Sequence, residues 1–85
     1  MSYKLTILSS TGVIAKTEST ATYLPTVDGE VGILDNHRAY CAVLGAGVVR
    51  YAPPGVADGA TAMKTVEIKG GFAEFSKGEL VVLAG

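Results

Sequence analysis

The feature that most constrains the fold is the brevity of every apolar segment in the chain. Apolar and polar residues alternate with a period of two over residues 3–8, and again over 65–69, where Val66 and Ile68 point one way and the charged side chains the other. Clusters of Gly, Pro, Asp, Asn and Ser separate the segments, and no window keeps an uninterrupted 3.6-residue period. The pattern predicts an all-β sandwich or barrel without any helix.

Other segments carry weaker or different signals. Residues 48–51, 72–75 and 80–83 are further short strand candidates. Residues 16–23 are rich in Thr but alternate poorly, which predicts an edge strand with both faces partly wet. The Gly-punctuated stretch 24–47 is interpreted as a shaped loop between strands, in which Gly29 and Gly32 permit positive φ angles and close backbone approach. Residues 53–60, rich in Pro and Gly, predict a flexible hairpin loop that is the most mobile part of the molecule.

Length and charge exclude several classes of protein. Eighty-five residues make one domain, 1–85, because so short a chain has no material for a second core. A net charge of -1 and the lack of Lys or Arg runs argue against nucleic-acid binding. The apolar runs are far shorter than a membrane span or a signal-peptide core, so a cytosolic protein is the default expectation. The single Cys41 excludes an internal disulfide and is expected to be a small buried apolar side chain.

Candidate catalytic and metal residues gather around Asp28, Glu30, Asp35 and His37. Their spacing matches no recurrent metal-binding motif, and acidic residues in turns commonly bond to nearby backbone donors instead. Acid–base catalysis by Glu30 and His37 lacks any reason for a perturbed pKa. We therefore expect no catalytic residue, no metal and no cofactor. An interaction surface explains the same residues with fewer assumptions, and Tyr40 fits an interface or the core equally well.

Two separated motifs in the chain resemble the epsilon subunit of bacterial-type rotary ATP synthase. The first consists of LPT at 24–26, DGEVGIL at 28–34, Asn36 with His37, and LGAGVVR at 44–50. The second consists of GGFAEF at 70–75 and LVVLA at 80–84, which is similar to the last hairpin of that subunit's N-terminal domain. Residues 3–9 are similar to its first strand. The resemblance covers almost the whole chain, with 16–23 and 52–63 as its weak parts.

The resemblance implies a flattened β-sandwich of about ten short, mostly antiparallel strands. It also implies a non-catalytic rotor part of the central stalk, which binds the gamma subunit and the polar loops of the membrane c-ring and couples proton-driven or sodium-driven rotation to ATP synthesis. The implied c-ring contacts are Asp28, Gly29 and Glu30. The implied gamma contacts are Ser9, His37, Arg38, Tyr40 and Ala42. The implied location is peripheral, on the cytoplasmic face of the bacterial plasma membrane.

The chain departs from the family pattern in two places. Family members commonly have a proline before the Asn or Gly that precedes the histidine, and Ala-Pro after the histidine, whereas Asp35 and Arg38-Ala39 occupy those places here. The family chain also continues into a two-helix hairpin that inhibits hydrolysis and in some members binds ATP, and this sequence ends at Gly85. If 85 residues is the natural length, we expect a subunit without that brake and without an ATP site.

Two other readings remain open from the residues alone. One is an unrelated small β-sandwich module that binds a peptide or small ligand along a sheet edge. The other is a small hydrolase using Glu30 and His37, which would need both groups within hydrogen-bond reach in one pocket.

Overall fold

The computed structural model describes residues 2–35 and 37–85, and in these residues it contains nine strands and no helix. The all-β prediction is confirmed, with nine strands where about ten were expected. The described part of the chain accordingly has no helix long and apolar enough to cross a membrane. In chain order the strands are β1 Tyr3–Ser9, β2 Gly12–Ser19, β3 Ala21–Thr26, β4 Gly29–Leu34, β5 Tyr40–Leu44, β6 Gly47–Tyr51, β7 Lys64–Ile68, β8 Gly71–Ser76 and β9 Glu79–Ala84.

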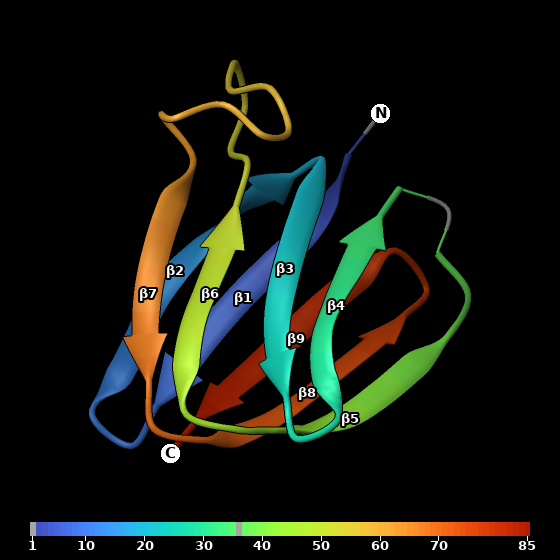
Figure 1. The fold of residues 1–85 in the computed structure, drawn as a ribbon. Coiled ribbons are helices and arrows are strands. Elements are labelled where there is room, and N and C mark those ends of the chain that lie inside the picture. Colours follow the sequence, from blue (N-terminus) through green and yellow to red (C-terminus); the bar gives the residue numbers. More distant parts are fainter. Residues whose placement is uncertain (1, 36) are drawn as a thin grey trace.

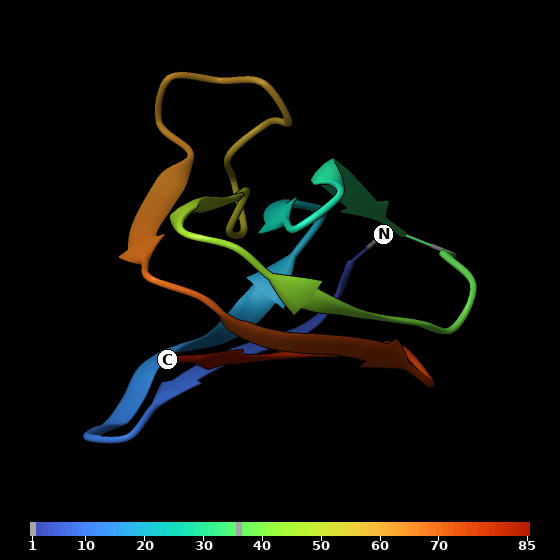
Figure 2. The same ribbon diagram turned by 60° about the horizontal axis from the view of Figure 1, so that its bottom comes forward.

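One continuous sheet folds over on itself to make two layers (Figures 1 and 2). The strand order is β2-β1-β9-β8-β5-β3-β6-β7. Strand β4 lies outside this order and pairs with β3. Within the described residues each pairing is antiparallel except that of β1 with β9. The fold-over lies between β5 and β3, which share the single residue pair Thr26 and Leu44. We call β2-β1-β9-β8-β5 the first layer and β4-β3-β6-β7 the second layer.

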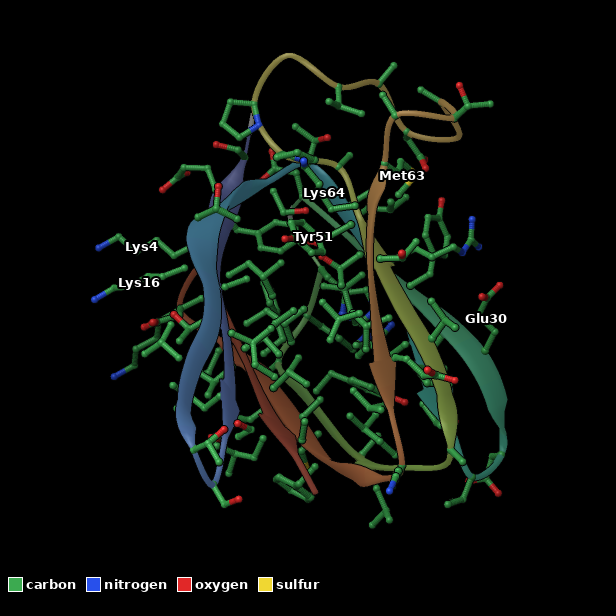
Figure 3. The ribbon with its side chains drawn as sticks, turned by 90° about the vertical axis from the view of Figure 1, so that its left-hand side faces the viewer. Lys4, Lys16, Glu30, Tyr51, Met63 and Lys64 are labelled. Atoms are coloured by element: carbon green, nitrogen blue, oxygen red, sulfur yellow. The ribbon has the colours of Figure 1, made fainter. Side chains whose placement is uncertain are left out.

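The core fills the space between the layers because alternate side chains of each strand point inward. Leu5, Leu80 and Val82 from the first layer and Leu24 and Ile33 from the second are completely buried. Figure 3 shows the apolar side chains between the layers, with Lys4 and Lys16 pointing outward on one side and Glu30 on the other. The two outer faces therefore carry whatever chemistry the domain offers.

A buried tyrosine ties the two layers together. The Tyr3 hydroxyl on β1 donates to the Ile33 carbonyl of β4 at 2.6 Å and lies 2.8 Å from Thr22 Oγ1 on β3. Its ring meets Phe75 edge-on at 5.2 Å between centroids. Burial raises the pKa of this hydroxyl above its ordinary value, because the phenolate would lose its water.

Two expectations about the first half of the chain are wrong. Residues 24–47 are not one loop: they contain the end of β3 and all of β4 and β5. Their inward positions, such as Ile33 and Leu44, alternate with small or exposed ones, and the glycines obscure that period in the sequence. Residues 16–23 are split between β2, which does lie at a sheet edge, and β3, which is paired on both sides and contains the buried Ala21 and Thr22. The predicted hairpin loop is confirmed as the connection between β6 and β7.

Candidate subunit-docking surface

An apolar row crosses the outer face of the first layer. It runs through Val13, Leu8, Leu83, Phe72 and Val43, and each residue lies directly opposite the next on the neighbouring strand. Apart from the partly buried Leu8, these side chains are between 41% and 61% exposed. Directly opposed side chains in paired strands lie within contact distance, so the apolar row forms one continuous strip.

The same face becomes polar toward the other end of the strands. Two residues further along lies a mixed row, in which Thr6 is opposite Val81 and Lys16. A charged row follows, in which Lys4 lies between Glu79 and Glu18. The face therefore has an apolar end and a charged end, which is the arrangement expected when one end is covered by another molecule and the other stays in water.

The apolar row extends to the turn between β3 and β4. The Val27 N–H of this turn donates to the Val43 carbonyl at 3.1 Å, and the Val27 side chain is 63% exposed. An open groove of about 440 Å³ lies between the turn and β5, and its lining includes Asp28, Ala42 and Phe72. The turn and the apolar row thus form one surface at one end of the molecule.

The predicted c-ring residues Asp28, Gly29 and Glu30 lie in this turn and at the start of β4. Gly29 has a φ of +117°, as expected, and it closes the turn. Thr26 Oγ1 donates to the Gly29 carbonyl at 2.6 Å and accepts from the Asp28 N–H at 3.2 Å, so the turn is internally hydrogen-bonded. Gly32 does not have a positive φ; its missing Cβ instead leaves room for a ring, since a Cβ there would lie 2.9 Å from Tyr23 Cε1.

The predicted gamma contacts divide into two groups. Ser9 follows Leu8 at the end of β1 and accepts from the Thr11 N–H at 3.2 Å, so it lies beside the apolar row. Tyr40 packs against the core, and Ala42 lies opposite the buried Ala73, so both point inward from β5. The outward positions of that strand are Cys41 and Val43.

His37 and Arg38 lie in the connection that leads into β5, at the opposite end of that strand from Val43. The His37 ring meets Tyr40 at 5.7 Å and Phe75 at 6.0 Å, edge-on in both cases, and its Nδ1 lies 2.8 Å from the Arg38 carbonyl. Figure 1 shows this connection at the opposite end of the strands from the β1–β2 and β3–β4 turns. The structure does not bring His37 and Arg38 to the apolar row.

The geometry does not assemble the alternative sites. Glu30 is the second residue of β4 whereas Asp35 and His37 follow its end, and a strand of the length from Glu30 to Leu34 spans about 17 Å. Among residues 2–35 and 37–85 no three His, Cys, Asp or Glu side chains are grouped to hold a metal ion. The expectation that Cys41 is buried is wrong: it is exposed, because it lies opposite Glu74 on the outward-facing side of β5.

Sequence reasoning missed the apolar row itself. Its signal was present in residues 80–83, which are apolar at every position. A strand with one wet face should alternate, so a continuous apolar run in a strand that is paired on both sides indicates that its outward side chains are covered as well as its inward ones. Val82 faces the core and Leu83 faces outward.

The fold and the surface together define a small β-sandwich that exposes an apolar row beside a hydrogen-bonded acidic turn. Residues 2–85 match the family described as "ATP synthase, Delta/Epsilon chain, beta-sandwich domain". The chain therefore belongs to this family, as the resemblance indicated.

Individual relatives agree with the family match. The chain is 40% identical over 72 residues to the ATP synthase epsilon chain of Symbiobacterium thermophilum, covering 85% of this chain and 48% of the relative. It is 32% identical over 82 residues to the ATP synthase epsilon chain of Desulfitobacterium hafniense, covering 96% of this chain and 58% of the relative. The chain thus spans about half the length of these curated relatives.

Two solved structures show the same fold. One is the cryo-EM structure of the Euglena gracilis mitochondrial ATP synthase OSCP/F1/c-ring, with a TM-score of 0.81, 23% identity, and coverage of 94% of this chain and 48% of that one. The other is the central stalk/c-ring of the Tetrahymena thermophila mitochondrial ATP synthase, with a TM-score of 0.75, 12% identity, and coverage of 95% and 61%. These findings do not favour the unrelated binding module.

Proposed function

We propose that this chain is the β-sandwich part of a non-catalytic central-stalk subunit of an ATP synthase, which attaches to the gamma subunit and to the c-ring and passes rotation between them. The family match and the relatives named ATP synthase epsilon chain support this role. In this role the domain is peripheral to the membrane, on the cytoplasmic face of a bacterial plasma membrane, and it needs no cofactor of its own.

The apolar row is the observation that carries the proposal. The core is already filled by inward-facing side chains, so Phe72, Leu83 and Val43 are not required for it and remain exposed at a cost in water. An extended strip of this kind, with a charged region beyond it, has the apolar centre and polar border of a protein interface. We assign the apolar row, together with Ser9, Cys41 and Val27 around it, to gamma.

The β3–β4 turn is assigned to the c-ring. Its carboxylates, Asp28 and Glu30, are exposed and suited to polar loops, and its internal hydrogen bonds keep its shape. Because the turn is bonded to Val43 through Val27, both contacts belong to one stiff body. A stiff connection is what transmission of torque requires.

Two exposed valines provide a matched test of the gamma assignment. Val43 is in the apolar row and Val48 is on the outer face of the second layer, at 55% and 42% exposure. With a gamma subunit from the same organism, we expect Val43→Asp to weaken binding about 30-fold or more, the effect of a residue central to an interface. Val48→Asp should bind as the unsubstituted chain does. Co-elution on gel filtration and calorimetry measure the two affinities.

The outcomes separate the hypotheses clearly. Equal losses for both variants would remove the apolar row as the docking surface. Separate elution of the unsubstituted chain and a folded gamma subunit would overturn the central-stalk role and favour the unrelated β-sandwich module.

A further inference from the structure

Four residues form a chain of contacts across the outer face of the second layer. Arg50 on β6 is at its centre, and its Nη2 donates to Glu30 Oε2 on β4 at 3.2 Å. The two residues lie on strands that are not neighbours, because β3 runs between them. The Arg50 side chain therefore reaches over β3 to hold a carboxylate on the far side.

The ring of Tyr23 supports Arg50 along this path. Tyr23 is opposite Arg50 in the β3–β6 pairing, and the guanidinium carbon lies 4.8 Å from the ring centroid, within the range of a cation–π contact. Tyr23 is also opposite Gly32 of β4, where a Cβ would lie 2.9 Å from the ring. The glycine thus leaves the space that the ring occupies.

The ring is in turn fixed from the β6–β7 loop. The Tyr23 hydroxyl donates to the Asp58 carboxylate, with Oδ1 at 2.7 Å and Oδ2 at 2.9 Å. This bond raises the pKa of the Tyr23 hydroxyl above its ordinary value, since ionisation would put two negative charges side by side. Asp58, Tyr23, Arg50 and Glu30 are contributed by four different segments of the chain.

This arrangement leaves part of the Glu30 carboxylate available. Oε2 accepts from Arg50, while the side chain is 56% exposed and points away from the molecule (Figure 3). Each contact alone is weak at such exposure. Their joint effect is to reduce the number of positions that the Glu30 side chain samples, which lowers the entropy cost of forming a further contact.

We propose that Arg50, supported by the ring of Tyr23, is a positioning residue that holds the Glu30 carboxylate ready for a hydrogen-bond donor of the c-ring loops. The inference rests on the proposed function for its ligand, and on the contacts of this face for its mechanism. Arg50 acts through Glu30 and needs no contact with the c-ring.

The first measurement is made on the chain alone. In the unsubstituted chain, the NMR couplings of the Glu30 side chain should show one dominant rotamer. In the Arg50→Gln variant the same couplings should be averaged over several rotamers, while the amide spectrum of both proteins stays that of a folded chain. Glu67, on the same outer face and opposite Val48, is the internal control and should not change. Averaged Glu30 couplings in the unsubstituted chain would overturn the positioning role, whether or not the chain binds a c-ring.

The second measurement is a double-mutant cycle on binding of the chain–gamma complex to the purified c-ring of the same organism. We expect Arg50→Gln to weaken binding about fivefold, and to have no effect in a Glu30→Gln background. Arg50→Lys should restore part of the affinity, since it keeps the charge but not the planar group. Tyr23→Leu should weaken binding more than Tyr23→Phe, which retains the ring.

The cycle tests the positioning role of Arg50 separately from the proposed binding to the c-ring. Equal effects of Arg50→Gln with and without Glu30 would overturn the positioning role while leaving ring binding intact. Failure of the unsubstituted complex to bind the ring would overturn the proposed function and the identity of the ligand.

Discussion

The two outer faces of this sandwich use opposite chemistry on similar strands. The first layer exposes an apolar row whose side chains contact one another across five strands. The second layer carries a polar network in which Arg50 joins Tyr23 to Glu30. The side chains of the apolar row are exposed to water, whereas the polar groups of the network contact one another. The first face therefore offers a large apolar contact area, and the second face orients a single carboxylate, that of Glu30.

The largest expected effect separates the core from the apolar row at two adjacent residues. Val82→Asp would bury an unpaired charge and should cost about 4 kcal/mol or more, which unfolds a small domain. Leu83→Asp places the same charge outward, where the side chain is 48% exposed. This variant should fold normally but lose its affinity for the gamma subunit. Circular dichroism with urea titration measures both. Unfolding of Leu83→Asp would mean that the apolar row supports the fold and is not a free surface.

The next effect compares an interior tyrosine with one on the second face. Tyr3→Phe removes the buried hydroxyl that bonds to the Ile33 carbonyl and Thr22 Oγ1, and should cost about 2 kcal/mol. Tyr23→Phe removes an exposed hydrogen bond and should cost less than about 1 kcal/mol. Urea midpoints at pH 8 give both values, and equal costs would show that the link between the layers is not the stronger contact.

The same pair predicts a pH dependence. The folded state raises the pKa of Tyr3, so below an unfolded pKa of about 10 both states keep the proton and stability is complete. As the pH rises further, the unfolded chain ionises first and stability falls. Tyr3→Phe should therefore lose less stability than the unsubstituted chain between pH 9 and pH 11. An unchanged slope in the variant would contradict the assigned cause.

A smaller effect uses the exposed thiol beside the apolar row. Cys41 should react readily with a thiol reagent in the isolated chain and more slowly in the gamma complex, because it lies on the outer face next to Val43. The matched control is Val48→Cys in a Cys41→Ala background, which places the thiol on the second face. Mass spectrometry follows both rates. Protection at position 48 instead would move the partner to the other face.

How far the sequence predicts this molecule depends on the kind of feature. Period-two alternation predicted β1 and β7, because each has one inward and one outward face. It failed at β4 and β5, where Gly32 and the small Ala42 weaken the apolar period. The turn at Asp28 and Gly29 was predictable from turn chemistry, and its positive φ is confirmed.

Features that depend on which strands become neighbours were not predictable. The apolar row joins residues from position 8 to position 83, and the Arg50–Glu30 pair crosses β3. Neither neighbourhood follows from local pattern, because strand order in a folded-over sheet is a property of the whole chain. The inward direction of Tyr40, for which core and interface were equally favoured, likewise required the register of β5 with β8.

The smallest expected effect lies on stability at Glu30, and it sharpens the contrast most. An exposed ion pair contributes about 0–1 kcal/mol, so Glu30→Gln should shift the free energy of unfolding by less than about 1 kcal/mol. Adding salt should shrink even that difference, since exposed charges are screened. Urea titrations at low and high salt measure both shifts, with Glu67→Gln on the same face as the control. A loss of several kcal/mol at Glu30 alone would make the network a structural cap of the β3–β4 hairpin. A negligible loss of stability would mean that the Glu30 carboxylate is not needed for folding. The contact of Arg50 with Glu30 would then act on binding to another molecule.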